Sequence, residues 1–159
     1  LETGKIKPRE FWKKLRAVTK IEASDQELEM AWNAMLFSIP KERVLQLADY
    51  GKHLPVYILS NTNAVHEELI NQLLQETLNV SRLDQLFTKV YFSHVIGHRK
   101  PNKEAYQHVL NDIGYSAQEV LFIDDLKENT DAAANLGMQV YNLRQMEDLI
   151  PFLQKRLGV

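Results

Sequence analysis

The chain has 159 residues, 45% of them hydrophobic, which is enough for one globular core with at most a small appendage. Its 19 basic and 21 acidic residues give a formal net charge of -2 without any block of like charge, so nucleic-acid and membrane-surface binding are disfavoured. Cysteine is absent, which excludes disulfides and thiolate metal sites, and no apolar run approaches a membrane span, so we expect a soluble, cytoplasmic protein.

The first 40 residues predict helices only. Pro8 suits the first turn of one helix, and a capping-box pattern at residues 24–27 begins a second helix whose apolar stripe runs to residue 39. Trp12 and Trp32 are expected to pack between these two helices as core anchors, because apolar stripes at helical spacing usually face a core. The all-helical segment ends at Pro40.

From residue 41 onward, helices alternate with short apolar strands. A helix that ends at Gly51 comes first, and a final helix is expected to start or kink at Pro151. The strands are predicted at residues 55–59, 89–93, 120–124 and 138–142. Because helices separate them, the pattern predicts an α/β fold with a parallel, doubly wound, Rossmann-like sheet.

Two adjacent carboxylates, Asp124 and Asp125, follow the third strand directly. Ligands of open α/β sheets bind at the carboxyl ends of the strands, and adjacent carboxylates are usually held by a cation. Carboxylate oxygens are hard ligands of the kind that Mg²⁺ prefers. The pair therefore predicts a Mg²⁺ site that serves a phosphate, with an exposed acidic loop as the alternative.

Two other strand ends carry groups suited to phosphate chemistry. Ser60 follows the first strand, where its hydroxyl and the following backbone N–H groups can hold phosphate oxygens, and Asn61 and Asn63 can add polar contacts. Lys100 follows the second strand and can neutralise charge that develops on a transferring phosphoryl group. Taken singly, Ser60 could be a helix cap and Lys100 a solvated surface charge. Their order along successive strands favours a phosphate site.

The order of these groups along the chain, a hydroxyl, a lysine and then a carboxylate pair, resembles that of the haloacid dehalogenase-like hydrolases. The segments similar to the second, third and fourth motifs of that family are residues 58–62, residues 97–101, and residues 122–125 with Asn129, Ala133 and Gly137. The resemblance covers roughly residues 44–142. The wording of the motifs is closest to the glucose-1-phosphatase-like branch, which implies a small phosphorylated metabolite, a sugar phosphate first, as the substrate.

The resemblance also implies roles for single residues. Phosphate and substrate are expected to be bound by Ser60, Asn61, Thr62 and Lys100. Of these, Ser60 and Lys100 are the expected catalytic groups. Mg²⁺ is expected to be held or oriented by Asp124 and Asp125. Residues 1–40 resemble part of the family's helical cap, and residues 41–159 its Rossmann-like core.

One family motif has no counterpart in the sequence. The first motif is Asp-x-Asp at the end of the first strand, supplying the nucleophile and the acid/base, and no Asp-x-Asp occurs here. In the family this strand lies between the strands predicted at residues 55–59 and 120–124. We therefore expect about 40–50 further residues upstream in the natural protein, the usual length of a strand and two helices. Residues 1–159 alone are expected to be inactive.

The expected function is that of a Mg²⁺-dependent phosphatase, or a phosphomutase, acting through an aspartyl-phosphate intermediate. A metal-independent dehalogenase is disfavoured by the carboxylate pair. A non-catalytic binding or regulatory module stays open as a second reading. A receiver domain does not fit, because its acidic pair follows the first strand of the domain. The protein is expected to be a monomer or a weak homodimer, and its five histidines show no metal-ligand spacing.

Overall fold

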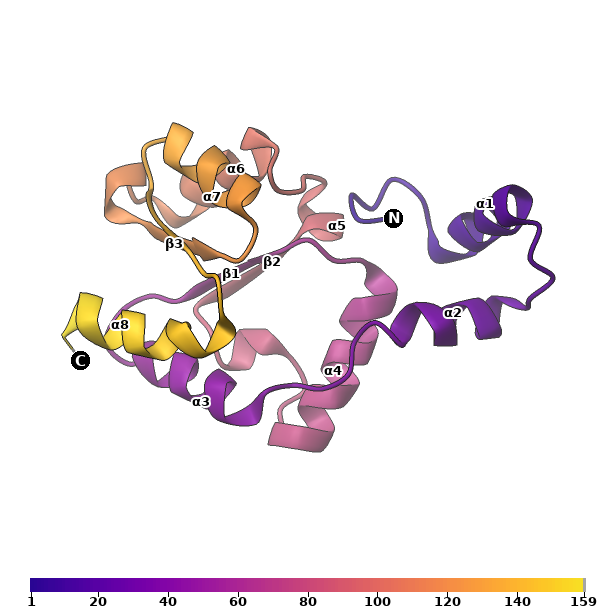
Figure 1. Cartoon of the computed structure of the whole chain (residues 1–159), viewed down its shortest axis with the longest axis horizontal. Coiled ribbons are helices and arrows are strands. Elements are labelled where there is room, and N and C mark those ends of the chain that lie inside the picture. Colours follow the sequence, from indigo (N-terminus) through magenta and orange to yellow (C-terminus); the bar gives the residue numbers. More distant parts are fainter. Residues whose placement is uncertain (159) are drawn as a thin grey trace. The chain divides into compact units, whose positions relative to one another are not determined.

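The structure, a computed structural model, describes residues 1–158. The chain divides into two compact units, Leu1–Gly97 and a second unit that starts at His98. Figure 1 labels most of the helices and strands of the two units. The expected division between a helical cap and the core at residue 40 stays a prediction.

Helices form the first part of the first unit: α1 (Pro8–Thr19), α2 (Asp25–Asn33) and α3 (Lys41–Tyr50). The predicted capping box is present at the start of α2, where the Ser24 hydroxyl accepts from the Glu27 N–H (3.2 Å) and the Glu27 carboxylate accepts from the Ser24 N–H (2.8 Å). These bonds satisfy two backbone donors that a helix start otherwise leaves open.

The predicted packing of the two tryptophans is confirmed. Trp12 is 1% exposed and forms a small core with Leu28 and Val65, against which the partly buried Trp32 packs. The two indole rings meet edge to face, with centroids 5.9 Å apart. The expected extension of α2 to residue 39 is wrong. The helix ends at Asn33, and Met35, on the expected apolar face, is 54% exposed, so packing on that face is weak beyond the helix end.

The first unit also contains a parallel pair of strands, β1 (Tyr57–Ser60) and β2 (Lys89–Phe92). The register places Tyr57 opposite Lys89 and Ser60 opposite Phe92. The two strands are connected by α4 (Ala64–Leu78) and the 3-10 turn η1 (Leu83–Gln85), and β2 leads into the short helix α5 (Ser93–Ile96).

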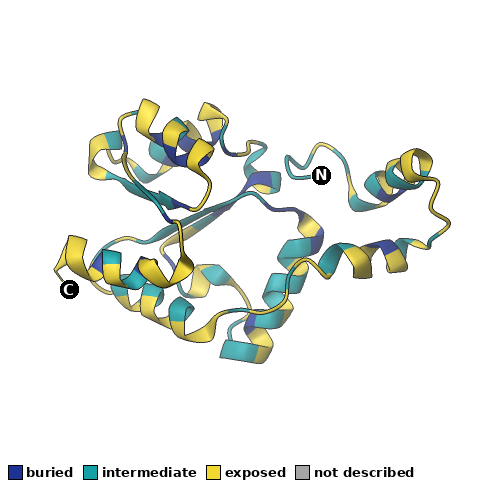
Figure 2. Ribbon diagram, viewed as in Figure 1, coloured by how far each residue is buried: buried dark blue, intermediate teal, exposed yellow. Residues whose placement is uncertain are grey.

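The second unit contains a second parallel pair, β3 (Leu121–Asp124) and β4 (Gln139–Asn142). Around it lie α6 (Lys103–Ile113), the 3-10 turn η2 (Ala117–Glu119), α7 (Lys127–Asn135), the 3-10 turn η3 (Met146–Asp148) and α8 (Leu149–Leu157). Figure 2 shows the buried face of α7, which is made by Asn129, Thr130 and Ala133.

All four predicted strands are therefore present, and parallel pairing through a helical crossover confirms the α/β class. Within residues 1–158, β1 pairs with β2 only and β3 pairs with β4 only. No helix in this described range combines the length and the apolar character that a membrane crossing requires.

Candidate active site

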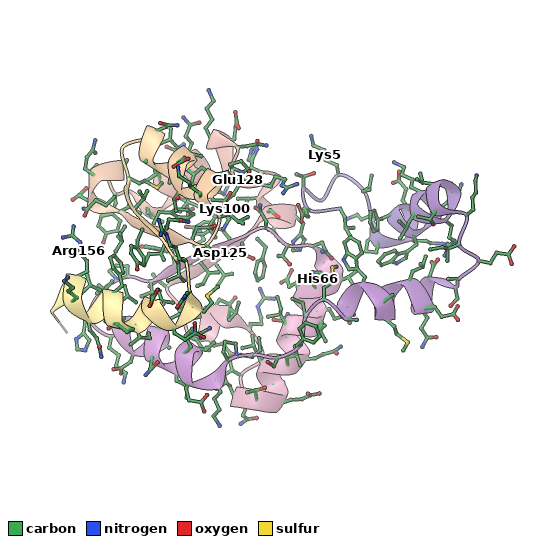
Figure 3. All side chains as sticks on the ribbon, viewed as in Figure 1. Lys5, His66, Lys100, Asp125, Glu128 and Arg156 are labelled. Carbon is green, nitrogen blue, oxygen red and sulfur yellow. The ribbon has the colours of Figure 1, made fainter. Side chains whose placement is uncertain are left out.

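A buried ion pair lies at the carboxyl end of β3. Lys100 Nζ donates to Asp124 Oδ2 over 2.6 Å, and the two side chains are 10% and 6% exposed. The Phe122 ring lies 5.6 Å from the same ammonium group, close enough for a cation–π contact. A lysine buried in this way has a fixed head group rather than the mobile one of a surface lysine. Figure 3 labels Lys100 on the second unit.

Asp124 is held by more than the lysine. Its Oδ1 accepts from the Leu126 N–H (2.9 Å) and from Asn129 Nδ2 (2.8 Å). Burial raises the pKa of Asp124, but hydrogen bonds from Lys100 and Asn129, the lysine charge and the Leu126 amide outweigh it and lower the pKa below its usual value. The carboxylate is therefore ionised at neutral pH and orients Lys100.

Tyr106 of α6 stabilises this arrangement through contacts with Asn129 and Phe122. Its hydroxyl donates to the Asn129 carbonyl (2.8 Å), and its ring meets Phe122 edge to face with centroids 5.3 Å apart. Burial, together with the negative charges of Asp124 and Glu128, raises the pKa of Tyr106 well above its usual range. The phenol is a neutral donor that fixes the first turn of α7.

Asp125 differs from its neighbour. It is exposed, and its carboxylate has no hydrogen bond or ion pair to residues 1–158. Its backbone carbonyl accepts from Asn142 Nδ2 at the end of β4 (3.0 Å), and the Asp124 carbonyl accepts from the same amide (3.3 Å). Asn142 therefore fixes the backbone of both aspartates while the Asp125 side chain stays accessible.

The donor set here suits a magnesium ion. Mg²⁺ is usually bound by one or two carboxylates together with waters and substrate phosphate. The accessible Asp125 carboxylate provides such a ligand, and Asn129 Oδ1 is a buried oxygen without a partner in the described part of the chain. No group of three or more His, Cys, Asp or Glu side chains within residues 1–158 could hold a metal by itself. These residues therefore fit as part of a coordination shell.

The segment after β1 is pinned by Ser93, the first residue of α5. The Thr62 N–H donates to Ser93 Oγ, and Ser93 Oγ donates to the Thr62 carbonyl, each over 3.0 Å. Ser93 is fully buried, and Thr62 is 5% exposed. One hydroxyl thus satisfies both backbone groups of Thr62, which fixes the course of the chain beyond Ser60.

Asn63 caps α4 at the other end of this segment. Its Oδ1 accepts from the Val65 N–H (3.1 Å) and the His66 N–H (3.2 Å). The sequence predicts that backbone amides after Ser60 hold phosphate oxygens. Two amides of the first turn of α4 are already engaged by Asn63, so phosphate binding here depends on Ser60 and on the remaining groups of residues 60–64.

The predicted site residues fall into two groups. Ser60, Asn61 and Thr62 lie on one short segment of the first unit, and Lys100, Asp124 and Asp125 meet at the end of β3 in the second unit. Their assigned roles in catalysis and metal binding stay predictions.

Sequence reasoning missed two supporting residues, Ser93 and Tyr106, and it named Asn129 only as part of the fourth motif, without a role. Ser93 is the last residue of the strand predicted at residues 89–93, and a hydroxyl at a strand end is a usable signal. Asn129 lies five residues after Asp124, in the first turn of the helix that follows the strand, so this contact is local in the sequence. Tyr106 carries no local signal, because its partner is 23 residues away in the sequence.

Curated proteins similar to this chain include two phosphatases. The chain is 27% identical over 147 residues to the D-ribitol-5-phosphate phosphatase of Bacteroides thetaiotaomicron, an alignment that covers 89% of this chain and 68% of that protein. It is 35% identical over 88 residues to a sesquiterpene phosphatase of Aspergillus oryzae, covering 55% of this chain and 41% of that protein.

Solved structures agree with these sequence matches. A haloacid dehalogenase family enzyme from Bacteroides thetaiotaomicron, crystallised with magnesium and inorganic phosphate, matches with a TM-score of 0.84 and 29% identity over 94% of this chain and 75% of that one. A predicted haloacid dehalogenase-like family hydrolase from Porphyromonas gingivalis matches with a TM-score of 0.89 and 29% identity, over 100% of this chain and 77% of that one.

The model of one protein family matches residues 59–143, which is more than half of the chain and includes residues 59–62 of the second motif and all of the third and fourth. With the parallel strands and the buried lysine–aspartate pair, this match confirms the family expected from the motifs. The chain belongs to the haloacid dehalogenase-like hydrolases.

Proposed function

We propose that the natural protein containing this chain is a Mg²⁺-dependent phosphatase that acts on a small phosphorylated metabolite. The observation that carries the proposal is the buried Lys100–Asp124 pair next to the accessible carboxylate of Asp125. A fixed cation beside a potential metal ligand matches the need of phosphoryl transfer for preorganised positive charge. The two phosphatases described above as similar to this chain support this reading.

Each group of residues has a distinct task in this proposal. Lys100 neutralises charge on the phosphoryl oxygens, and Asp124 holds its ammonium group in place. The Ser60 hydroxyl donates a hydrogen bond to a phosphate oxygen. Ser93 and Asn63 fix the segment that follows Ser60. The magnesium ligand is Asp125, with Asp124 beside it. When bound there, Mg²⁺ would stabilise the negative charge on the phosphoryl oxygens.

The nucleophile in this proposal is a carboxylate outside residues 1–159. An aspartyl-phosphate intermediate forms when that carboxylate attacks phosphorus and the alcohol leaves, and water then hydrolyses the acyl phosphate. The sequence contains no Asp-x-Asp that could take this role. The buried Asp124 carboxylate does not replace it, because three hydrogen-bond donors already engage it.

The proposed substrate class is a phosphorylated sugar or polyol. The motif wording of the glucose-1-phosphatase-like branch favours it, and so does the relative that hydrolyses D-ribitol-5-phosphate. The protein is further proposed to be cytoplasmic and a monomer or weak homodimer, which light scattering of the purified protein would check.

A hydrolysis screen of the natural full-length protein tests the proposal. Phosphorylated sugars, polyols and nucleotides are assayed with Mg²⁺ and with EDTA, together with 2-haloacids for the dehalogenase alternative. We expect phosphate release that requires Mg²⁺ and falls about 100-fold or more in Asp125→Asn, because loss of a group that only supports a metal ligand already costs about 10- to 100-fold. The exposed Asp131→Asn serves as the control. Activity that survives both EDTA and Asp125→Asn would contradict the proposal, and turnover of haloacids alone would replace it.

A further inference from the structure

His66 connects the N-terminal helices to the start of α4. Its Nε2 lies 3.2 Å from the Trp32 carbonyl oxygen, and its ring stacks on the Trp32 indole with centroids 5.8 Å apart and 30° between the planes. A carbonyl oxygen can only accept, so Nε2 carries the proton in this contact. In the neutral ring, Nδ1 is therefore an acceptor with a free lone pair.

Separate contacts fix the ring and the backbone of His66. Trp32 meets Phe11 and Trp12 edge to face, at 5.0 and 5.9 Å between centroids. The His66 backbone N–H donates to Asn63 Oδ1, in the segment that follows Ser60. Three residues along a helix correspond to a rise of about 4.5 Å, so His66 begins within one helical turn of that segment, a separation that a phosphorylated sugar or polyol can span. Figure 3 labels His66 at this end of α4.

Polar atoms at this position lack partners. His66 Nδ1 has no hydrogen-bond partner in the part of the chain that the structure describes, and it is not enclosed. Trp32 Nε1 and Asn33 Oδ1 are buried and likewise without a partner within residues 1–158. Folded proteins leave few polar atoms without a partner, and of these three the Nδ1 of His66 is the one that a bound ligand can reach, because it is not enclosed.

We propose that His66 determines specificity by accepting, through Nδ1, a hydrogen bond from a hydroxyl group of a sugar or polyol phosphate. The inference rests on the function proposed above and adds the residue that reads the part of the substrate that does not react. An imidazole nitrogen with a free lone pair suits a hydroxyl donor, and an acceptor held by Trp32 loses little conformational freedom on binding.

A purely structural role for His66 makes different predictions, and two substitutions separate them. In His66→Gln, the side-chain amide can reach the position of Nε2 and keep the bond to the Trp32 carbonyl, but nothing replaces Nδ1. In His66→Asn, the shorter amide places an oxygen near the position of Nδ1 but cannot reach Trp32.

The experiment compares a polyol phosphate with p-nitrophenyl phosphate, which has no hydroxyl group on its leaving part, in the natural full-length protein. We expect His66→Gln to raise KM for the polyol phosphate about 10-fold, the loss of one hydrogen bond, with the aryl phosphate and the melting temperature unchanged. We expect His66→Asn to lower the melting temperature while the preference for the polyol phosphate stays within about 2-fold of the wild type.

Two results would overturn the inference in different ways. If the wild type hydrolyses both substrates and His66→Gln leaves their ratio unchanged, His66 is a structural tether only and the proposed function stands. If the wild type hydrolyses neither substrate with Mg²⁺, the proposed function fails and the inference fails with it.

Discussion

Two ion pairs in the second unit have the same geometry and different surroundings. The N–O distance is 2.6 Å in both Lys100–Asp124 and Lys127–Asp131. The first pair has side chains that are 10% and 6% exposed, and the second has side chains that are 76% and 57% exposed. Water screens the second pair and not the first, so distance alone does not set their contributions to stability.

We predict that Lys100→Met lowers the free energy of unfolding by about 3–5 kcal/mol, because it leaves the Asp124 carboxylate buried without its cation. Lys127→Met, the matched control, is expected to cost less than about 1 kcal/mol. Urea unfolding at pH 7 measures both. Equal losses in the two variants would show that the Lys100 pair is solvated in solution.

The lowered pKa of Asp124 makes stability depend on pH with a definite sign. A carboxyl whose pKa is lower in the folded state stabilises the fold above its unfolded pKa of about 3.9, and this stabilisation is lost as the pH falls through the folded value. The difference in unfolding free energy between wild type and Asp124→Asn should therefore be largest near pH 7 and shrink below pH 4. A difference that is constant down to pH 2 would contradict the lowered pKa.

The element that positions Ser60 is the loop between β1 and α4, and its key contact is non-local. Ser93 Oγ bonds both backbone groups of Thr62, 31 residues away in the sequence. We predict that Ser93→Ala costs about 1–3 kcal/mol, because it leaves a buried N–H and a buried carbonyl unsatisfied. Amide hydrogen exchange should also become faster at residues 61–66.

Ser24→Ala provides the control for this experiment. It removes the exposed cap of α2 and should cost about 1 kcal/mol without faster exchange at residues 61–66. Unchanged exchange in Ser93→Ala would mean that the loop is held by other contacts.

At the scale of the whole molecule, the sequence predicts the strands well because each has a strong local signal. The apolar run that ends in Asp124 and the run that ends in Ser60 are visible without any tertiary information. Helix ends depend on packing instead, which is why α2 stops at Asn33 rather than at residue 39.

The candidate site was predictable in its residues but not in its contacts. Spacing along the sequence identifies Lys100 and the aspartate pair, but it does not show which aspartate pairs with the lysine and which stays accessible. That Asp124 is buried against Lys100, and Asp125 exposed, depends on how β3, β4 and α7 pack. The same limitation applies to His66, whose partner Trp32 lies 34 residues away.

Residues 1–159 by themselves should release no phosphate from any substrate of the natural full-length protein, because the proposed nucleophile lies outside them. Parallel assays of both proteins with Mg²⁺ check this. Turnover by residues 1–159 would assign the nucleophile to this chain and would contradict the proposed mechanism.

The aromatic cluster around Trp12 and Trp32 has a spectroscopic consequence. These are the two tryptophans of the 159 residues, and both lie in the first unit. Intrinsic tryptophan fluorescence of this chain therefore reports on α1, α2 and the start of α4, whereas the tyrosine near-ultraviolet signal includes Tyr106 beside the Lys100 pair. Coincident denaturation midpoints for the two signals would mean that the units unfold as one cooperative system, and separate midpoints would give each unit a stability of its own.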